Sequence, residues 1–440
     1  MKPAKYIEGF SRLTLEEQTA RLSAMTNDPD FASRLMKDFR PGDEAFLKKF
    51  NEFSENTVSA FALPFGVAPN FLINGKVYHV PMVIEESSVV AAASNAAKFW
   101  WKRGGFRTRI VSAVKAGQVH FTSDADPQAL LALNKKLEPW LMERVKPITS
   151  RMMERGGGVL SARINDSRDL MPRYYQLDVR FDTVDSMGAN FINSCLEEMA
   201  AGLYEYIQQA LPGTHTEVIM SILSNYVPEC LVEASLETPV SDLAGIHPEL
   251  SPENFVRRFS TAITIAQQNV NRAVTHNKGI MNGVDAVVIA TGNDFRAVEA
   301  GVHAFASRSG QYRSLTRMDQ EEGIFRYTLT LPLSLGTVGG LTSLHPIAGL
   351  SLELLGNPSA TDLMQIAAAA GLANNFSAVR ALVTWGIQKG HMMMHLSNIL
   401  NTLDADDNEK LAAKAHFNGH KVSYSAVEMF VKNLRNEPIR

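Results

Sequence analysis

Three ionisable side chains, Glu86, Lys278 and Asp294, stand where the sequence predicts the ends of helices and strands. Lys278 follows a helical pattern, and we expect an apolar strand to connect it with Asp294 at a glycine turn. Such a lysine can offer a fixed positive charge to an oxygen that becomes negative, and an aspartate can keep the lysine charged. Each residue alone is better explained by helix-dipole and capping preferences. Together, on either side of one buried strand, they indicate a paired site.

Glu86 lies between the apolar segment VPMVI and a predicted helix. An acid at the start of a helix is common, because it favours the helix dipole by about 0.3–1 kcal/mol. This structural interpretation is the stronger one from spacing alone. A catalytic role requires a partly desolvated carboxyl that can be protonated near neutral pH.

His391 and His395 are four residues apart in GIQKGHMMMHLSN, so on a helix they share a face and could bind zinc. The zinc-protease pattern requires a glutamate directly after the first histidine, where this chain has Met392. No third ligand is evident, so we expect no metal. The remaining alternatives for His391 are a packed side chain and a proton donor near neutral pH.

Two glycine-containing turns could approach a ligand. DSMGAN (185–190) stands where a strand meets a helix, and backbone N–H groups there suit a diphosphate. It is not a GxGxxG fingerprint, and tight packing of the glycine explains it equally well. For GTVGGLTSLHP (336–346), an ordinary turn is the favoured explanation.

Composition limits the architecture that must position these residues. The chain has 440 residues, enough for two or three domains, with 45% apolar and 20% charged residues. A net charge of −3 argues against a nucleic-acid partner. Only Cys195 and Cys230 are present, no signal peptide is evident, and no apolar run is long enough to span a bilayer. We therefore expect a soluble cytoplasmic protein with no membrane partner.

The periodicity predicts an α+β fold. Asn74-Gly75 indicates a hairpin, and a helix should begin near Ser87 or Ser88 and stop at Gly104-Gly105. Further predictions are short helices over 1–50, exposed strands over 106–122, a charged helix over about 127–155, a strand over 175–181 and a long helix after DSMGAN. The two strand–helix passages predict a small α+β domain inserted into a larger one.

The second half begins with a helix start at Ser251-Pro252. One apolar face runs from Phe255 to Ala273, and we expect this helix to end close to Lys278-Gly279. Strands and helices then alternate, 359–400 is rich in helix, and 401–440 is polar and charged.

Six segments, in order from about residue 50 to about 400, resemble the soluble bacterial (class II) hydroxymethylglutaryl-CoA (HMG-CoA) reductases. The segments are ENTVSAFALPFGVAPNF, VPMVIEESSVVAAASNAAK, DSMGAN, NRAVTHNKGIMNGVDAVVIATGNDFRAVEAG, GTVGGLTSLHP and LVTWGIQKGHMMMH. The resemblance implies reduction of HMG-CoA to mevalonate and free coenzyme A with two hydrides from NADH or NADPH, and a place in isoprenoid metabolism.

The resemblance also implies residue roles. Glu86 matches the catalytic proton donor, Lys278 the cation that stabilises each oxyanion, and Asp294 the residue that tunes the lysine–glutamate network. His391 matches the histidine that protonates the departing thiolate. The implied substrate-binding residues are Glu55, Asn56, Ser88, Arg272, Thr275 and Asn282. The implied cofactor-binding residues are Asp185, Met187, Gly188 and Asn190.

The implied architecture is a large mixed α/β domain from 1–110 and 222–385, with an inserted small, ferredoxin-like nucleotide-binding domain over 111–221. Residues 386–440 resemble a C-terminal helical flap that carries His391. Family members form dimers with the active site at the interface, so a homodimer or a multiple of it is implied.

Some positions depart from the family pattern. Trp385 stands in place of a glutamate, Ser87 in place of a frequent proline, and Ser186 in place of the alanine of DAMGAN. Arg151 or Arg155 could accept a 2′-phosphate, which leaves NADH and NADPH open. Competing hypotheses are a CoA-thioester hydrolase or acyltransferase, for which no well-placed nucleophile is evident, and a non-catalytic CoA-binding relative. The direction of the reaction in the cell is not readable.

Overall fold

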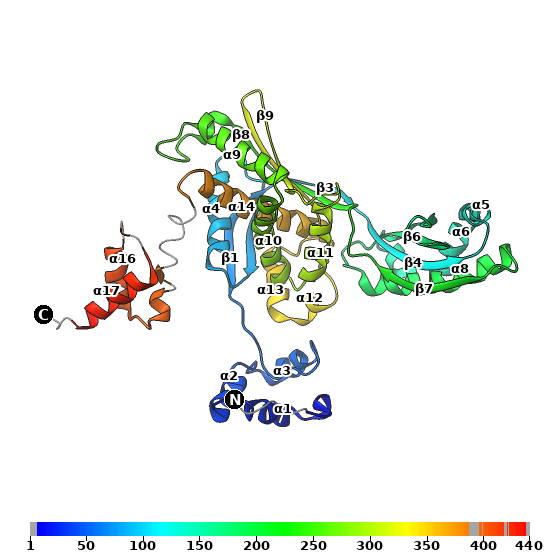
Figure 1. The fold of residues 1–440 in the computed structure, drawn as a ribbon, viewed down its shortest axis with the longest axis horizontal. Coiled ribbons are helices and arrows are strands. Elements are labelled where there is room, and N and C mark those ends of the chain that lie inside the picture. The colour runs from blue at the N-terminus through cyan, green and yellow to red at the C-terminus, as the bar shows by residue number, and fades with distance from the viewer. Residues whose placement is uncertain (1–6, 387–395, 398, 418–419, 421, 437–440) are drawn as a thin grey trace. The chain divides into compact units, whose positions relative to one another are not determined.

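The computed structural model describes residues 7–386, 396–397, 399–417, 420 and 422–436 (Figure 1). The chain divides into two compact units, Met1–Pro64 and Phe65–Arg440, which are described separately. The first contains η1 (Phe10–Arg12), α1 (Leu15–Ser23), α2 (Pro29–Asp38) and α3 (Glu44–Asn51). Side chains of Thr14, Asp28 and Asp43 cap the three α-helices by accepting first-turn N–H groups. The predicted short helices are thus confirmed.

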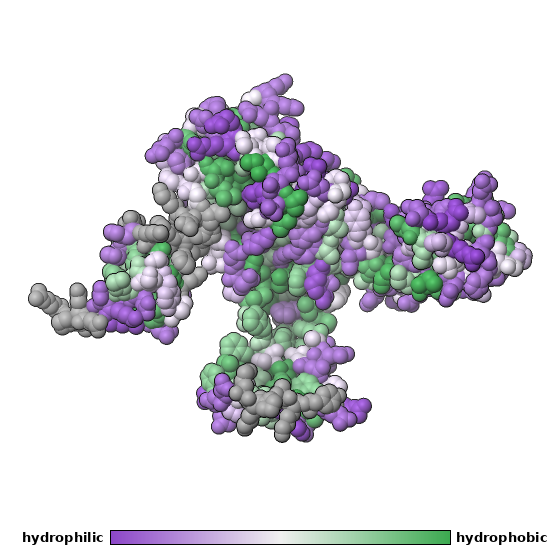
Figure 2. All heavy atoms as spheres, viewed as in Figure 1, coloured by the Kyte–Doolittle hydropathy of each residue, from purple (hydrophilic) through white to green (hydrophobic). Residues whose placement is uncertain are grey.

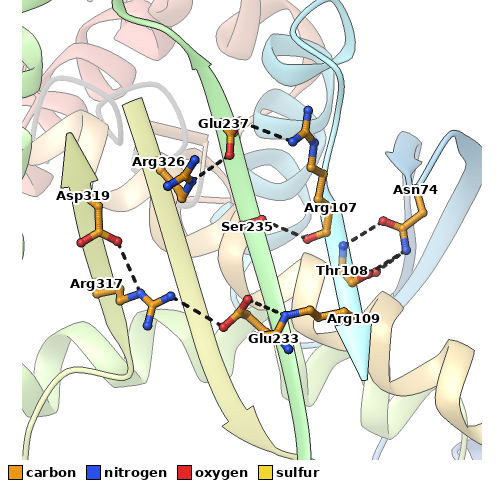
Figure 3. Close-up of polar contacts among 10 residues, drawn as sticks. All are labelled: Asn74, Arg107, Thr108, Arg109, Glu233, Ser235, Glu237, Arg317, Asp319 and Arg326. Atoms are coloured by element: carbon orange, nitrogen blue, oxygen red, sulfur yellow. Dashed lines mark hydrogen bonds and ion pairs between the residues drawn. The ribbon is translucent and has the colours of Figure 1, made fainter. Parts of the chain in front are cut away.

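The second unit begins with a hairpin of β1 (Phe65–Ile73) and β2 (Lys76–Val83). Asn74 and Gly75 have φ values of 50° and 82°, the left-handed pair that a tight two-residue turn requires. The side chain of Asn74 also donates to the carbonyl of Thr108 and accepts from its N–H, both at 2.9 Å (Figure 3). The dipeptide therefore makes the turn and ties it to the next sheet.

The sheet of the large part has the strand order β3-β8-β10-β9. Its face away from the helices carries charged side chains in cross-strand rows (Figure 3). Glu233 pairs with Arg109 at 2.9 Å, and Glu237 pairs with Arg326 at 2.8 Å. The helix α14 packs against β3, β8 and β10. The bounds are β3 (Arg107–Ala113), β8 (Cys230–Pro239), β9 (Thr316–Glu321), β10 (Ile324–Pro332) and α14 (Ala360–Val383).

The inserted part has a core of its own, formed where one sheet packs on helices. Its strand order β5-β6-β4-β7, all antiparallel, with helices after β4 and β6, is that of a ferredoxin-like fold, as the resemblance implied. β4 is central and largely buried, so the expectation of exposed strands over 106–122 was wrong for this segment. The bounds are β4 (Lys115–Ser123), α5 (Pro127–Ala132), α6 (Asn134–Arg144), α7 (Lys146–Met153), β5 (Gly158–Asp166), β6 (Tyr174–Asp182), α8 (Ala189–Ala210) and β7 (Thr216–Leu223).

The segment that carries Lys278 corrects one prediction. The helix α9 (Pro252–Gln268) begins at the expected Ser251 cap but ends at Asn269, whose side chain caps a second helix, α10 (Val270–Ala290). The predicted strand between Lys278 and Asp294 does not exist, because α10 continues through it. Lys278 therefore lies in the middle of a helix.

Glycines let α10 and α14 approach closely (Figure 1). A Cβ on Gly283 would lie 2.3 Å from the carbonyl oxygen of Ala370, and one on Gly371 would lie 2.8 Å from Val284. Among the described residues, α14 is the one helix long and apolar enough to cross a membrane, and 67% of its apolar window is buried in the protein. Its apolarity is that of a core helix.

The remaining helices complete the second unit. The helix α4 (Ser87–Trp101) starts where predicted and precedes Gly104 and Gly105, which both have positive φ. A separate small core is formed by Leu396, Ile399, Leu400, Ala405, Ala413, Phe417, Val422, Val427 and Val431. The other bounds are η2 (Val240–Leu243), α11 (Phe295–Ala306), α12 (Leu341–Leu344), α13 (Pro346–Leu354), α16 (Asp407–His416) and α17 (Tyr424–Asn436).

Candidate active site

An ion pair joins Glu86 to Lys278, although the two residues are 192 positions apart. Lys278 Nζ donates to Glu86 Oε2 at 2.8 Å, and the two side chains are 61% and 38% exposed respectively. At that exposure an ion pair stabilises a fold by only about 0–1 kcal/mol. The ion pair therefore contributes little to stability, but it places a cation and an acid side by side at a surface that a substrate can reach.

The start of α4 positions Glu86. Its backbone is extended at the N-cap, and its carboxylate accepts from Ser88 Oγ at 3.0 Å through the oxygen that does not face Lys278. Ser88, one of the predicted substrate-binding residues, thus contacts a predicted catalytic residue. Glu86 is thus held between Lys278 and Ser88 at the cleft that Ser88 also lines.

One face of α10 gathers predicted substrate-binding residues around Lys278. Thr275, Lys278 and Asn282 follow at helical spacing of three and four residues, and Arg272 lies one turn before Thr275. Burial lowers the pKa of Arg272, an effect that the nearby Tyr327 opposes. A half-buried guanidinium of this kind suits a carboxylate ligand.

A cleft of about 340 Å³ opens beside the ion pair, between α4, α10 and α14. Glu86, Ser88 and Asn282 line it together with the end of α14. The sequence analysis did not single out Arg380, which also lines the cleft and donates to Asn95 Oδ1 at 3.1 Å. Burial, followed by the charge of Arg103, lowers the pKa of Arg380. The cleft thus holds a cation as well as the ion pair at its mouth.

Trp385 lies at the same cleft and is 51% exposed. Its ring centroid is 4.1 Å from that of the buried His247. Where the family pattern has a charged residue, this chain therefore has an aromatic surface held by a second ring.

Asp294 has the helix-capping place that its position in the sequence favoured. It caps α11, accepting N–H groups of Arg296 and Ala297, and pairs with the Arg296 guanidinium at 3.1 Å. Burial acts to raise its pKa, but these hydrogen bonds outweigh burial, so the pKa is lowered. The expected contact between Asp294 and Lys278 is absent from the described ion pairs, in which Lys278 pairs with Glu86. A catalytic role for Asp294 stays a prediction.

The two glycine-containing turns form a second cleft, of about 330 Å³. Met187, Gly188 and Asn190 of DSMGAN lie in it beside the turn that contains Gly336 and Gly340, and Asp294 lies at its edge. The sequence analysis had preferred an ordinary turn at Gly336. The structure instead brings that turn to the N-terminus of α8.

Close packing makes these glycines necessary. A Cβ on Gly336 would lie 2.4 Å from the nitrogen of Met187, and one on Gly188, whose φ is 86°, would lie 2.5 Å from Thr183. Gly188 also has no side chain to cap α8, so first-turn N–H groups are left for a ligand. Backbone donors, a helix N-terminus and close glycines are the set that a dinucleotide diphosphate requires.

Asp185 anchors this loop and does not line the cleft. Its carboxylate accepts the N–H of Ala360 at 2.8 Å, and its carbonyl oxygen accepts the N–H of Thr337, also at 2.8 Å. Lys115, which the sequence analysis missed, holds the opposite side of the loop. The sequence does indicate that Lys115 is buried, because it lies on the same face of β4 as the buried Val119 and Phe121.

A partly buried pair of acids was also missed. Burial, and then the neighbouring Glu299, raises the pKa of Asp285 to about 9. Glu299 contacts His303 Nε2 at 2.5 Å, which lowers the pKa of Glu299, and His303 Nδ1 is 2.7 Å from the hydroxyl of Tyr312. These groups connect α10, α11 and the following loop.

The remaining predicted residues belong to other parts of the chain. Glu55 and Asn56 belong to the first unit, where they line a cavity of about 450 Å³, and Asn56 has a left-handed φ of 58°. His391 and His395 lie outside the described residues. In the part of the chain that is described, no group of three or more His, Cys, Asp or Glu side chains could hold a metal.

Comparison with known proteins gives one consistent result. The sequence model for hydroxymethylglutaryl-coenzyme A reductase matches residues 19–396. The 3-hydroxy-3-methylglutaryl-coenzyme A reductase of Archaeoglobus fulgidus is 36% identical over 398 residues, covering 89% of this chain and 86% of that protein. A probable reductase of the same name from Borreliella burgdorferi is 34% identical over 371 residues, covering 83% and 81%.

The fold is similar to a solved structure of the class II reductase of Streptococcus pneumoniae, bound to NADPH in open conformations. The TM-score is 0.72 at 36% identity, with 86% of this chain and 100% of that chain covered. A second structure of the reductase from the same organism has a TM-score of 0.73 at 34% identity, covering 98% and 100%.

Proposed function

This chain belongs to the hydroxymethylglutaryl-CoA reductase family, and on that premise we propose that Glu86 and Lys278 form the centre at which it reduces HMG-CoA. The reaction converts HMG-CoA, two NAD(P)H and two protons into mevalonate, coenzyme A and two NAD(P)⁺. The observation that carries the proposal is the 2.8 Å contact between Lys278 Nζ and Glu86 Oε2, beside the cleft that Ser88 and Asn282 line.

The two reduction steps require a cation and a proton donor, which Lys278 and Glu86 can supply. Each reduction leaves negative charge on the former carbonyl oxygen, and a fixed ammonium stabilises that charge as it forms. Lys278 is the cation, and Glu86, when protonated, donates a proton to the same oxygen. Cleavage of the thioester releases a thiolate, and His391 is proposed to protonate it on the strength of the family resemblance. We assign Asp294 the tuning of this network on the same ground.

Nicotinamide nucleotide supplies the hydrides when it is bound. We assign its diphosphate to the second cleft, formed by the two glycine-containing turns and called the glycine cleft below. Met187, Gly188 and Asn190 line this cleft at the N-terminus of α8, and Asp185 anchors the loop. Support comes from the fit of this cleft to a diphosphate and from the NADPH named for the Streptococcus pneumoniae reductase. Arg151 and Arg155 are exposed at the end of α7 and could distinguish NADPH from NADH.

The acyl group is proposed to lie along the exposed face of α10. Arg272 is suited to its free carboxylate, and Thr275, Asn282 and Ser88 to its oxygens. Glu55 and Asn56 are assigned to the substrate from the family pattern.

We also propose that the protein forms a homodimer, or a multiple of it, in the cytoplasm. The proposed domains are the large domain (1–110 and 222–385), the small domain (111–221) and the flap (386–440). Support for self-association comes from a row of apolar side chains left at least 40% exposed on α12 and α13: Leu341, Leu344, Ile347, Leu350 and Leu354. Figure 2 shows apolar surface gathered in this part of the unit. Apolar patches of this kind mark interfaces.

The test is loss of reduced-nicotinamide absorbance in purified protein with HMG-CoA. The proposal expects two nucleotides oxidised for each coenzyme A released. Glu86→Gln and Lys278→Met should each lower kcat by about 10²-fold or more, while unfolding midpoints stay near wild type because the exposed pair contributes little stability. Lys146→Met breaks a comparable exposed pair with Glu143 and serves as the matched control.

A thioester hydrolase would release coenzyme A with no nucleotide oxidised. The hydroxyl of Ser88 contacts the ion pair, but its Oγ hydrogen bond runs to Glu86, and among the described residues no histidine is hydrogen-bonded to it. A hydrolase reaction, or full activity in both variants, would overturn the proposal.

A further inference from the structure

Lys115 is a buried lysine at the start of β4, with 4% of its surface exposed. Its ammonium donates to three oxygens: Thr183 Oγ1 at 2.5 Å, the Ser186 carbonyl at 2.6 Å and the Met187 carbonyl at 3.2 Å. An ammonium has three N–H donors, so its hydrogen-bonding capacity is filled by this one loop. Thr183 Oγ1 donates in turn to the Ser186 carbonyl at 2.6 Å.

These contacts fix the two peptide planes that precede α8. A trans peptide is planar, with its C=O and N–H directed to opposite sides. Holding the carbonyls of Ser186 and Met187 toward Lys115 therefore turns the N–H groups of Met187 and Gly188 away from it. Both residues line the glycine cleft.

We propose that Lys115 is a positioning residue for the nucleotide site, which holds the loop 183–188 in the conformation that presents the N-terminus of α8 to the nucleotide diphosphate. The inference rests on the proposed function, because it needs that cleft to be the nucleotide site. Lys115 acts through the loop: its three bonds run to loop oxygens, and Met187 lies between its ammonium and the cleft.

The charge around Lys115 supports this assignment over a purely structural role. Its three partners are neutral oxygens, which is a costly way to bury an ammonium. Burial lowers the pKa of Lys115, an effect that the neighbouring Cys230, Asp182 and Asp185 oppose, and burial raises the pKa of the Cys230 thiol to about 11. The three acceptor oxygens match the three N–H donors of an ammonium, so the geometry favours the charged form of Lys115, whose charge adds to that of the α8 N-terminus, where a diphosphate benefits from it.

The test compares Lys115→Met with wild type in three measurements: the Kd for NADPH and for NADH from nucleotide fluorescence, KM for nucleotide and KM for HMG-CoA. Lys136→Met, an exposed lysine on α6 of the same domain, is the matched control. Thr183→Val is the second variant, which removes one oxygen of the network with little change in shape. Urea unfolding of each variant reports whether the fold is kept.

The expected result for Lys115→Met is a nucleotide Kd and KM raised by about tenfold or more, with KM for HMG-CoA within about twofold of wild type. Thr183→Val should show a smaller loss of the same kind, and Lys136→Met none. Unchanged nucleotide affinity in Lys115→Met, or equal losses for nucleotide and HMG-CoA, would overturn the inference. If Lys115→Met does not fold, Thr183→Val decides by the same criterion. Wild-type protein that binds no nucleotide would instead contradict the proposed function.

Discussion

Replacing Asp285 with asparagine should stabilise the protein at neutral and alkaline pH and flatten its pH dependence. Asp285 is a partly buried residue on α10, and its buried Oδ1 has no hydrogen-bond partner among the described residues. Its other neighbour is Glu299, whose own pKa is lowered by His303. Burial and Glu299 raise the pKa of Asp285 to about 9, so the folded protein holds a proton there at pH 7.

The sign follows from proton uptake. Between the ordinary pKa of 3.8 and about 9, the folded protein binds a proton at Asp285 that the unfolded chain has lost. The free energy of unfolding therefore falls as pH rises, by at most about 1.4 kcal/mol per pH unit. At pH 7 this amounts to up to about 4 kcal/mol, and shared titration with Glu299 and residual solvent contact reduce the expected effect to about half.

The asparagine amide can donate an N–H to Glu299 in place of the O–H of the protonated carboxyl, and it does not ionise. We expect the stability of Asp285→Asn relative to wild type to increase by about 1–3 kcal/mol from pH 6 to pH 8. The assay is urea unfolding followed by the fluorescence of tryptophans such as Trp100, which is fully buried in the same core. Asp169→Asn, at an exposed position, is the control. Parallel pH profiles for Asp285→Asn and wild type would refute the reasoning.

Two further predictions concern the same helix. Gly283→Ala should lower the free energy of unfolding by about 2–4 kcal/mol, because the added Cβ would lie 2.3 Å from the Ala370 carbonyl oxygen. The control is Gly349→Ala on α13, which has open space around it and should change that free energy by less than about 1 kcal/mol. Equal urea midpoints for the two variants would contradict this. Burial, and then Arg272, lowers the pKa of His276 to about 3, so the unfolded chain takes up a proton below about 6.5 and stability falls as pH drops from 6.5 toward 3. His276→Gln should lose less of its thermal midpoint than wild type between pH 7 and pH 4.5, and an equal loss would argue against a buried neutral His276.

Local signals in the sequence were sufficient for several elements. The Asn74-Gly75 turn, the Ser251 cap and the period-two strand that became β6 were all predicted, because each depends on residues within a few positions. The prediction failed between Asn269 and Asp294. The apolar run from Ala286 to Ala290 is buried almost all round, in a helix that packs against α14 and β2, so its periodicity does not distinguish helix from strand.

The contacts of the candidate site could not be predicted from local sequence signals either. Glu86 and Lys278 were identified by family resemblance, but their contact spans 192 positions and could not follow from spacing within either segment. Lys115 was missed for a different reason. A lysine in an alternating strand is ordinarily placed on the solvent side, and only the inward phase of its neighbours distinguishes it.

The position of Lys278 is set by how α10 packs as well as by its own sequence. Successive residues of an α-helix are separated by about 100°, so the helix must have one rotation for Lys278 to face Glu86 while Gly283 faces α14. Two close contacts between α10 and α14 hold that rotation, because a side chain at either glycine would collide with the other helix. They are the contact of Gly283 with Ala370 and the contact of Gly371 with Ile280 and Val284. A change at Gly283 that is accommodated by turning or shifting α10 would therefore move Lys278 away from Glu86. Loss of activity greater than the loss of folded protein in Gly283→Ala would be the sign of that displacement, since Gly283 contacts α14 and lies outside the residues that line the cleft.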